Sequence, residues 1–264
     1  SSQAQAGLKI QQWQTSNGAA VYFVENHDLP IIDISTSFYA GSAQDDANKL
    51  GVAAITRHLM TLGAAGLSEE KISQQFADIG AQLGGGIDDD KSSFSLRTLS
   101  SSLERDKALS LYIKILQKPD FPEDVLAREK SRVIAGLREA ATQPETIADK
   151  AYSKALFGSH PYGFSTEPEQ VEKVDRYDVE KFYQLHYGAQ GAVIALIGDK
   201  DPTTRRLLEA ILNDEEEHAD ELKKLTDAQL SNTIAVVEAL LLRSIFDVSA
   251  LLALGQQRLV GLGA

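Results

Sequence analysis

The chain has 264 residues, of which 43% are hydrophobic and 24% charged, and these values exclude a wholly disordered or fibrous protein. Its 38 acidic residues exceed its 26 basic residues, and the net charge of -12 argues against a general nucleic-acid binder or a protein held on anionic lipid. The chain has no Cys, which excludes disulfides, thiolate zinc sites and cysteine nucleophiles. Any catalytic metal must therefore be held by His and carboxylates.

The first seven residues are small and polar and contain Ala4-Gln5-Ala6. This composition resembles the end of a secretory signal peptide, and it predicts a periplasmic or secreted protein. A flexible terminus is the alternative interpretation, and with it a cytoplasmic location. The most apolar stretch, residues 233–255, contains three charged residues, so it predicts an amphipathic helix rather than a membrane span.

The first 40 residues are predicted to form strands. Residues 9–15 alternate in polarity, and Asn17-Gly18 is a strong hairpin signal because both residues tolerate positive φ. Residues 20–24 then return as the second strand of the hairpin. A β-branched run over residues 31–39 predicts a third strand, which ends before Gly41.

The rest of the chain is mainly helical in pattern. Two further strands are predicted over 92–99 and 192–197, and no strand is predicted beyond residue 199. Helices are expected over 50–62, 68–80, 101–117, 122–141, 145–157 and 176–186. The predicted fold class is α+β, with helices packed on a mainly antiparallel sheet over residues 8–200, followed by a helical C-terminal segment of two helices over 201–264.

The helix over 50–62 carries the sequence Gly-Val-Ala-Ala-Ile-Thr-Arg-His-Leu-Met from residue 51. This sequence resembles the signature helix of the pitrilysin/insulinase-type zinc metallopeptidases, which include the processing peptidases. Further similar segments follow in the family's order over residues 8–200: Phe121-Pro122-Glu123, Arg128-Glu129-Lys130, the run from Leu156 to Gly163, and the strand ending at Gly198-Asp199. The resemblance implies the fold of that family's N-terminal domain.

The resemblance also locates the family's catalytic positions, and they are degenerate here. Active members carry H-x-x-E-H, in which two His bind zinc and the Glu is the base. Here the first His is replaced by Ala54, the Glu by Arg57, and only the second His remains, as His58. By spacing, the third ligand falls on Ala135. We therefore expect no bound zinc or other cofactor and no peptide hydrolysis by this chain alone.

What the resemblance still implies is a role beside a partner. Two related halves or subunits of this family often enclose a peptide chamber, so the expected partner is an active zinc-bearing paralogue in a heterodimer, or a second copy in a homodimer. Active members bind a peptide along an exposed edge strand. The matching positions are Leu83, Gly84, Gly85, Gly86 and Ile87, where the glycines would let another backbone approach. A solvated Gly-Asp loop is the alternative.

Three other functions are left open by the sequence. The chain could be an active zinc peptidase with unconventional ligands, or an assembly module that binds no peptide. Residues 201–225 resemble the last helix of bacterioferritin- or Dps-like proteins, and Glu215 and His218 have the Glu-x-x-His spacing of a ferritin-like iron site. The remaining ligands of such a site cannot be assembled from the chain.

Overall fold

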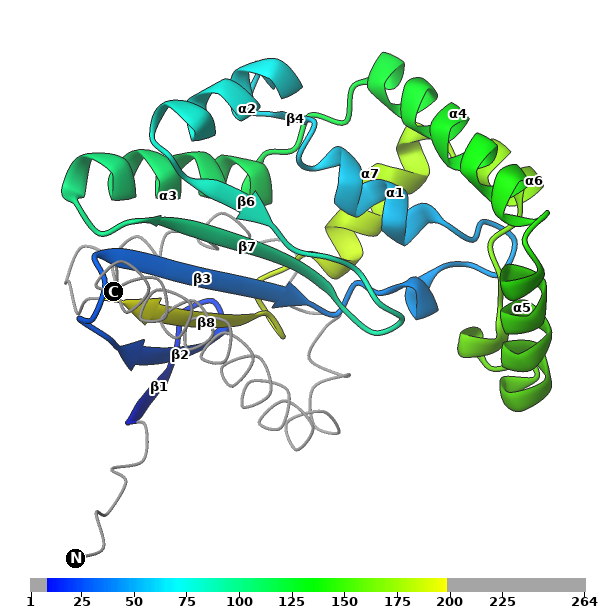
Figure 1. Cartoon of the computed structure of the whole chain (residues 1–264), viewed down its shortest axis with the longest axis horizontal. Coiled ribbons are helices and arrows are strands. Elements are labelled where there is room, and N and C mark those ends of the chain that lie inside the picture. The colour runs from blue at the N-terminus through cyan, green and yellow to red at the C-terminus, as the bar shows by residue number, and fades with distance from the viewer. Residues whose placement is uncertain (1–8, 199–264) are drawn as a thin grey trace, which may run out of the picture. The chain divides into compact units, whose positions relative to one another are not determined.

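The computed structural model of the chain describes residues 9–198, in which a six-stranded sheet packs against helices (Figure 1). The strand order is β1-β2-β8-β3-β7-β6, and every neighbouring pair is antiparallel except β2 and β8. This arrangement confirms the α+β prediction with a mainly antiparallel sheet. The predictions for residues 1–8 and 201–264, including Glu215 and His218, lie outside the described residues.

The strands match the predicted segments closely. A separate two-stranded pair, β4 and β5, lies between the first two helices and has no counterpart in the sequence prediction. The strands are β1 (Ile10–Gln14), β2 (Ala20–Glu25), β3 (Ile31–Phe38), β4 (Gly63–Ala64), β5 (Leu67–Ser68), β6 (Gln82–Gly84), β7 (Ser92–Leu99) and β8 (Val193–Gly198).

The hairpin between β1 and β2 turns where the sequence predicts it. Gly18 adopts a φ of 98°, and the amide of Gly18 donates to the carbonyl oxygen of Thr15. The strand β8 then pairs with β2 in parallel and with β3 antiparallel. The last described strand is therefore central in the sheet, between two strands from the start of the chain.

Strands β3 and β7 have one buried, largely apolar face and one polar face, whereas β2 and β8 bury apolar residues on both faces. In β7, Ser92, Phe94, Leu96 and Thr98 are buried, as their alternation predicts. On the other face Arg97 lies opposite Asp33 of β3, and its guanidinium donates to that carboxylate at 2.7 and 2.9 Å. The helices cover the apolar face, where α3 contacts β7.

Six of the seven described helices begin and end near the predicted residues, and the short helix over 168–172 has no counterpart in the sequence prediction. The largest difference is the helix predicted over 50–62, which starts later because Gly51 is left-handed with a φ of 100° and ends earlier because the amides of Thr61 and Leu62 make i→i−3 bonds. The helices are α1 (Val52–Leu59), α2 (Glu69–Asp78), α3 (Ser102–Gln117), α4 (Glu123–Ala140), α5 (Pro144–Phe157), α6 (Pro168–Glu172) and α7 (Arg176–His186).

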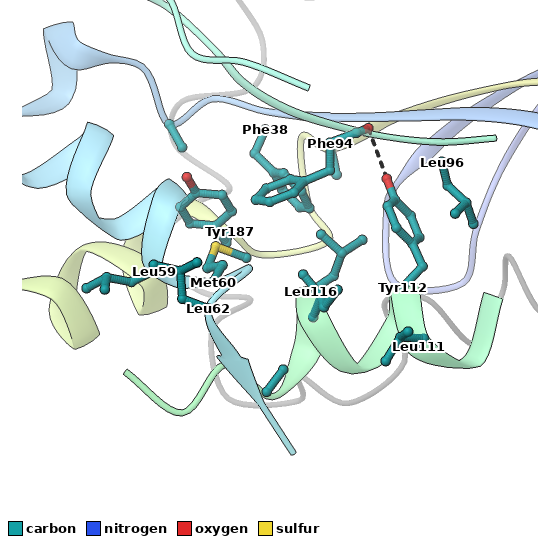
Figure 2. Close-up of a cluster of buried hydrophobic side chains, with 14 of the residues drawn as sticks. Phe38, Leu59, Met60, Leu62, Phe94, Leu96, Leu111, Tyr112, Leu116 and Tyr187 are labelled. Atoms are coloured by element: carbon teal, nitrogen blue, oxygen red, sulfur yellow. Dashed lines mark hydrogen bonds between the residues drawn. The ribbon is translucent and has the colours of Figure 1, made fainter. Parts of the chain in front are cut away.

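The core joins the sheet to six of the seven described helices, all except α5. The rings of Phe38, Phe94 and Tyr187 lie within 6.4 Å of one another, centroid to centroid, in tilted and edge-on contacts (Figure 2). The buried side chain of Tyr112 on α3 donates a hydrogen bond to the carbonyl oxygen of Phe94 at 3.0 Å. Leu59 and Met60 pack beside this aromatic group and are fully buried. None of the described helices is long and apolar enough to cross a membrane.

Replacement of Tyr112 by Phe removes the buried hydroxyl and leaves the Phe94 carbonyl without that donor. We expect Tyr112→Phe to lower the free energy of unfolding by about 1–3 kcal/mol, measured by urea denaturation. Tyr177→Phe is the matched control, because Tyr177 on α7 is 67% exposed, and it should change stability little. Equal stabilities of the two variants would contradict the structural role of the Tyr112 hydroxyl.

Candidate functional site

The helix α1 presents one buried face and one open face. Its N-terminus is capped by Asp45, whose carboxylate accepts the amides of Gly51 at 2.6 Å and Ala53 at 2.7 Å. Burial raises the pKa of Asp45 to about 6, although these two hydrogen bonds favour its charged form. The apolar residues that the sequence pattern identifies are all buried: Leu50, Val52, Ile55, Leu59 and Leu62.

Of the three degenerate positions of α1, Ala54 and His58 lie away from that core, whereas the guanidinium of Arg57 lies over the ring of Phe94. Ala54 is exposed, and Arg57 and His58 are partly buried. His58 lies against α4, where its Nε2 atom is 3.1 Å from the Oε2 atom of Glu129. The His58 side chain is 44% exposed, whereas that of Glu129 is only 3% exposed. The family position that remains is therefore bound to a buried carboxylate.

Glu129 is the centre of a network of charges. Its carboxylate accepts hydrogen bonds from Nε of Arg128 at 2.8 Å and from Nη1 of Arg132 at 3.0 Å, in addition to the His58 contact. Arg128 also donates to Glu69 of α2 at 2.7 Å. Burial alone would raise the pKa of Glu129, but the hydrogen bonds from Arg128 and His58 and the charge of Arg132 outweigh it and hold the pKa below its ordinary value.

Glu129 belongs to a segment that resembles the family, but its position beside His58 is not predicted from the sequence. The signal that could have found it is the composition of α4, where a Glu stands between two Arg at positions 128 and 132. A carboxylate flanked in this way can be buried, because its charge is compensated on both sides. The contact with His58 depends on how α1 and α4 pack, which local sequence does not specify.

The residues around His58 do not fit a zinc ion. Zinc sites take three protein ligands and an open position, and here Ala54 offers a methyl group and Arg57 a cation. The Glu129 carboxylate, the remaining candidate, already accepts from three donors. Among residues 9–198 no group of three or more His, Asp and Glu side chains could hold a metal.

The predicted third ligand position, Ala135, is exposed on α4. Helical geometry puts residue 136 on the same face as Glu129, seven residues earlier, and Ala135 roughly 120° around the helix from it. Gly136 is also exposed. The assignment of the missing ligand to Ala135 stays a prediction. Gly136 is the neighbouring position that, on this helical geometry, shares the face of α4 that carries Glu129.

Arg57 points toward the sheet rather than toward α4. Its Nη2 atom lies 3.3 Å from the carbonyl oxygen of Ser93 on β7 and 3.5 Å from that of Gly84 on β6. Its guanidinium carbon lies 5.2 Å from the centroid of the Phe94 ring, within range of a cation–π contact. Burial lowers the pKa of this guanidinium, and Tyr187 opposes that change.

The predicted peptide-binding segment includes a strand at the edge of the sheet. The strand β6 pairs only with β7, so its other side is not covered by a strand of the described chain. Leu83 lies within β6 and packs against the core. Ile87 continues the pairing as an isolated bridge to Ser92. Gly85 and Gly86 lie outside β6 and are exposed, so the solvated loop stays an alternative for them, and peptide binding by this edge stays a prediction.

The glycines of this segment have different surroundings. Gly85 adopts a φ of 113°, and a side chain there would collide with the carbonyl group of Ser93. A Cβ atom on Gly84 would lie 2.8 Å from the hydroxyl of Ser95, whereas one on Gly86 would meet no atom within 4 Å. The backbone that closely approaches Gly85 is therefore that of the neighbouring strand β7 of the same chain, and the close group at Gly84 is the Ser95 side chain.

The turn after this segment is fixed to the body of the domain. The carbonyl oxygens of Asp88, Asp89 and Asp90 accept the amides of residues 42, 43 and 41, at 3.0, 2.8 and 3.1 Å. The hydroxyl of Tyr162 donates to the Asp90 carboxylate at 2.5 Å, and this hydrogen bond, more than burial, raises the pKa of Tyr162 to about 12. The turn that ends the candidate edge is thus held in place by hydrogen bonds.

Comparisons with known proteins agree with this geometry. The model of the insulinase family, peptidase family M16, matches residues 21–169. A non-peptidase homolog, YmxG of Helicobacter pylori, is 24% identical over 197 residues, which are 72% of this chain and 45% of that protein. The solved inactive domain of an M16 peptidase from Pseudomonas fluorescens has a TM-score of 0.74 and 35% identity, over 78% of this chain and 51% of that one.

A further solved structure is similar in fold. The first half of the periplasmic protease PqqL from Escherichia coli has a TM-score of 0.67 and 19% identity, over 77% of this chain and 46% of that one. The chain therefore spans about half the length of the relatives that it matches. Two of these three relatives are named as inactive or non-peptidase proteins.

Neutralisation of Glu129 tests the network around it. We expect Glu129→Gln to lower the free energy of unfolding by about 1–3 kcal/mol at pH 7, because the guanidinium groups of Arg128 and Arg132 and the ring of His58 lose their ionic acceptor. The pKa of Glu129 is lower in the folded state, so this stabilisation is complete above the ordinary Glu pKa of about 4.3 and is lost as the pH falls through the folded-state value.

The difference between wild type and Glu129→Gln should therefore shrink as urea denaturation is repeated at decreasing pH. Glu139→Gln is the matched control, because Glu139 lies on the same helix and is exposed. It should change stability by only a few tenths of a kcal/mol at any pH, within the roughly 0.5 kcal/mol typical of surface substitutions. A Glu129→Gln deficit that is independent of pH would contradict the electrostatic explanation.

Proposed function

Because this chain belongs to the insulinase family of peptidases, peptidase family M16, we propose that it is a non-catalytic member that forms a peptide-binding chamber with an active, zinc-bearing paralogue. The observation that carries the proposal is the state of the catalytic positions. The first zinc His is Ala54, the base is Arg57, and the remaining His58 is bound to Glu129. The proposed assembly is a heterodimer.

The chemistry of these residues supports the absence of peptidase activity. Hydrolysis by this family's motif requires a metal to polarise the carbonyl group and a base to accept a proton from water. A guanidinium remains protonated in proteins, so Arg57 cannot accept that proton. The side chains of α1 and α4 that would hold the metal are instead joined by the Glu129 network.

Exposed apolar side chains on α5 support the proposal that the chain binds a partner protein. In contrast to α3 and α4, α5 has no buried residue, and it lies at the margin of the domain beside α6 (Figure 1). Its large apolar side chains are strongly exposed: Ile147 at 56%, Tyr152 at 67%, Leu156 at 58% and Phe157 at 41%. Tyr152 and Leu156 are four residues apart and therefore share one face of the helix, and neighbouring exposed apolar side chains occur at protein–protein contact sites.

The edge strand β6 supports peptide binding within such a chamber. An uncovered edge offers unpaired backbone groups to a peptide that adds as a further strand. The segment proposed to bind the peptide comprises Leu83, Gly84, Gly85, Gly86 and Ile87. For location we propose the periplasm, which is where the similar protease PqqL is named as residing, and fractionation of the source cells tests it.

The central experiment combines the chain with proteins from its source. We expect the purified chain alone to cleave no peptide, a pull-down to recover a paralogue with an intact H-x-x-E-H, and peptidase activity to rise when the two are mixed. Recovery of an active paralogue whose activity the chain does not change would favour an assembly module. Stoichiometric zinc and chelator-sensitive cleavage by the purified chain would contradict the proposal.

A substitution on α5 tests whether this helix lies in the interface with the partner. We expect Leu156→Asp to weaken binding to the recovered paralogue at least ten-fold, because it places a charge in an apolar contact, as measured by surface plasmon resonance. Leu103→Asp is the matched control, since Leu103 on α3 is exposed to a similar degree, 60% against 58%. Equal loss of binding in the two variants, or loss in neither, would remove α5 from the interface.

Restoration of the ligands tests the assignment of the degenerate positions. We expect Ala54→His, Arg57→Glu and a Glu at residue 135 or 136 together to create stoichiometric zinc binding, because they rebuild two His, a base and a carboxylate. Two triple variants, one with Ala135→Glu and one with Gly136→Glu, are compared by metal analysis after dialysis. Ala54→His alone is the control. Absence of zinc from both triple variants would mean that the assignment is wrong.

A further inference from the structure

Arg57 is a partly buried cation without a carboxylate partner among residues 9–198. Arg97, Arg132 and Arg176 each lie within 3.0 Å of a carboxylate oxygen, but the contacts of Arg57 are the carbonyl oxygens of Gly84 and Ser93 and the Phe94 ring. Its Nε atom is buried and has no hydrogen-bond acceptor. A cation in this state is incompletely compensated, because burial removes water without supplying an opposite charge.

The side chain of Arg57 connects α1 to the edge of the sheet. Its side chain extends from the helix to the carbonyl groups of β6 and β7, and the Phe94 ring lies beneath the guanidinium. These contacts fix the side chain without using all five of its N–H donors. The guanidinium is therefore held in advance next to the strand along which the peptide is proposed to bind.

The carboxylates closest in sequence to this edge are already engaged. The carboxylate of Asp88 accepts a hydrogen bond from the amide of Lys91. The carboxylates of Asp89 and Asp90 accept hydrogen bonds from the hydroxyl groups of Ser42 and Tyr162, respectively. They lie in the turn beyond Ile87, whereas Arg57 contacts Gly84. The edge thus has a cation beside Gly84 and three acidic residues beyond Ile87. A negative charge on a bound strand would be favoured near Arg57 and disfavoured near the three Asp residues.

We propose that Arg57 binds a carboxylate of a peptide that lies along β6. An Arg guanidinium recognises carboxylates through two parallel charge-assisted hydrogen bonds, which a neutral amide cannot reproduce. The degenerate position of the catalytic base has then become a determinant of peptide selectivity. This inference rests on the proposed function, because it assigns a ligand class to the same edge. The carboxylate can come from an acidic side chain or from a C-terminus.

Fluorescein-labelled nonapeptides of alternating Val and Thr provide the probes. One set carries a single Glu at each position in turn with an amidated C-terminus, a second carries Gln at the same positions, and a third has no acidic side chain but a free C-terminus. Fluorescence anisotropy should show that one Glu register, or the free C-terminus, binds about ten-fold more tightly than its neutral counterpart. The Glu set and the free-acid set distinguish the two sources of the carboxylate.

Variants of the chain identify the group responsible. Arg57→Gln should abolish the preference for the carboxylate while binding of neutral peptides continues, and Arg57→Lys should retain part of it. Arg138→Gln is the control, because it removes the same charge from an exposed position on α4, and it should leave the preference unchanged. Circular dichroism melting curves establish that each variant is folded.

Two outcomes would overturn the inference in different ways. If acidic and neutral peptides bind equally well to the wild type, peptide binding at the edge stands and the role of Arg57 is wrong. If no peptide binds, the Arg57 inference fails together with peptide binding by this chain, and the mixing experiment with the paralogue then decides whether the remaining proposed function holds.

Discussion

The buried carboxylate of Glu129 holds together the part of the domain from which a peptidase of this family would work. It is only 3% exposed and it accepts from His58 on α1 and from Arg128 and Arg132 on its own helix. Such a carboxylate is costly to bury unless positive charges surround it. The two helices that zinc would bridge in an active relative are here joined by the contact between His58 and Glu129.

The fold and the chemistry of this family are separable in this chain for a structural reason. The apolar residues of α1 point into a core with Phe38, Phe94 and Tyr187, whereas Ala54 and His58 point away from it. The residues at Ala54 and His58 therefore do not contribute to the core, and the sheet and helices do not depend on them. Arg57 is the exception, because its side chain contacts the edge strands and has gained a new environment there.

The sequence was sufficient for most local elements and insufficient for long-range pairings. The strand β7 and the helix α7 were predicted at their observed bounds, because alternation over 92–99 and apolar periodicity over 176–186 are local signals. The insertion of β8 between β2 and β3 joins segments more than 150 residues apart, and no local pattern specifies it. The contact of His58 with Glu129 is unpredictable for the same reason, because the two residues are 71 positions apart on different helices.

The fixed turn at Asp88, Asp89 and Asp90 has a consequence for the energetics of association. Its three carbonyl groups accept hydrogen bonds from the consecutive amides of residues 41, 42 and 43. Any side chain at Gly41 would collide with the backbone of the turn. The conformational entropy of this end of the edge strand is therefore lost when the domain folds, and not again when a strand is added. A ligand that pairs with β6 meets an acceptor that is already ordered, so the enthalpy of its backbone hydrogen bonds is offset mainly by the ordering of the ligand itself.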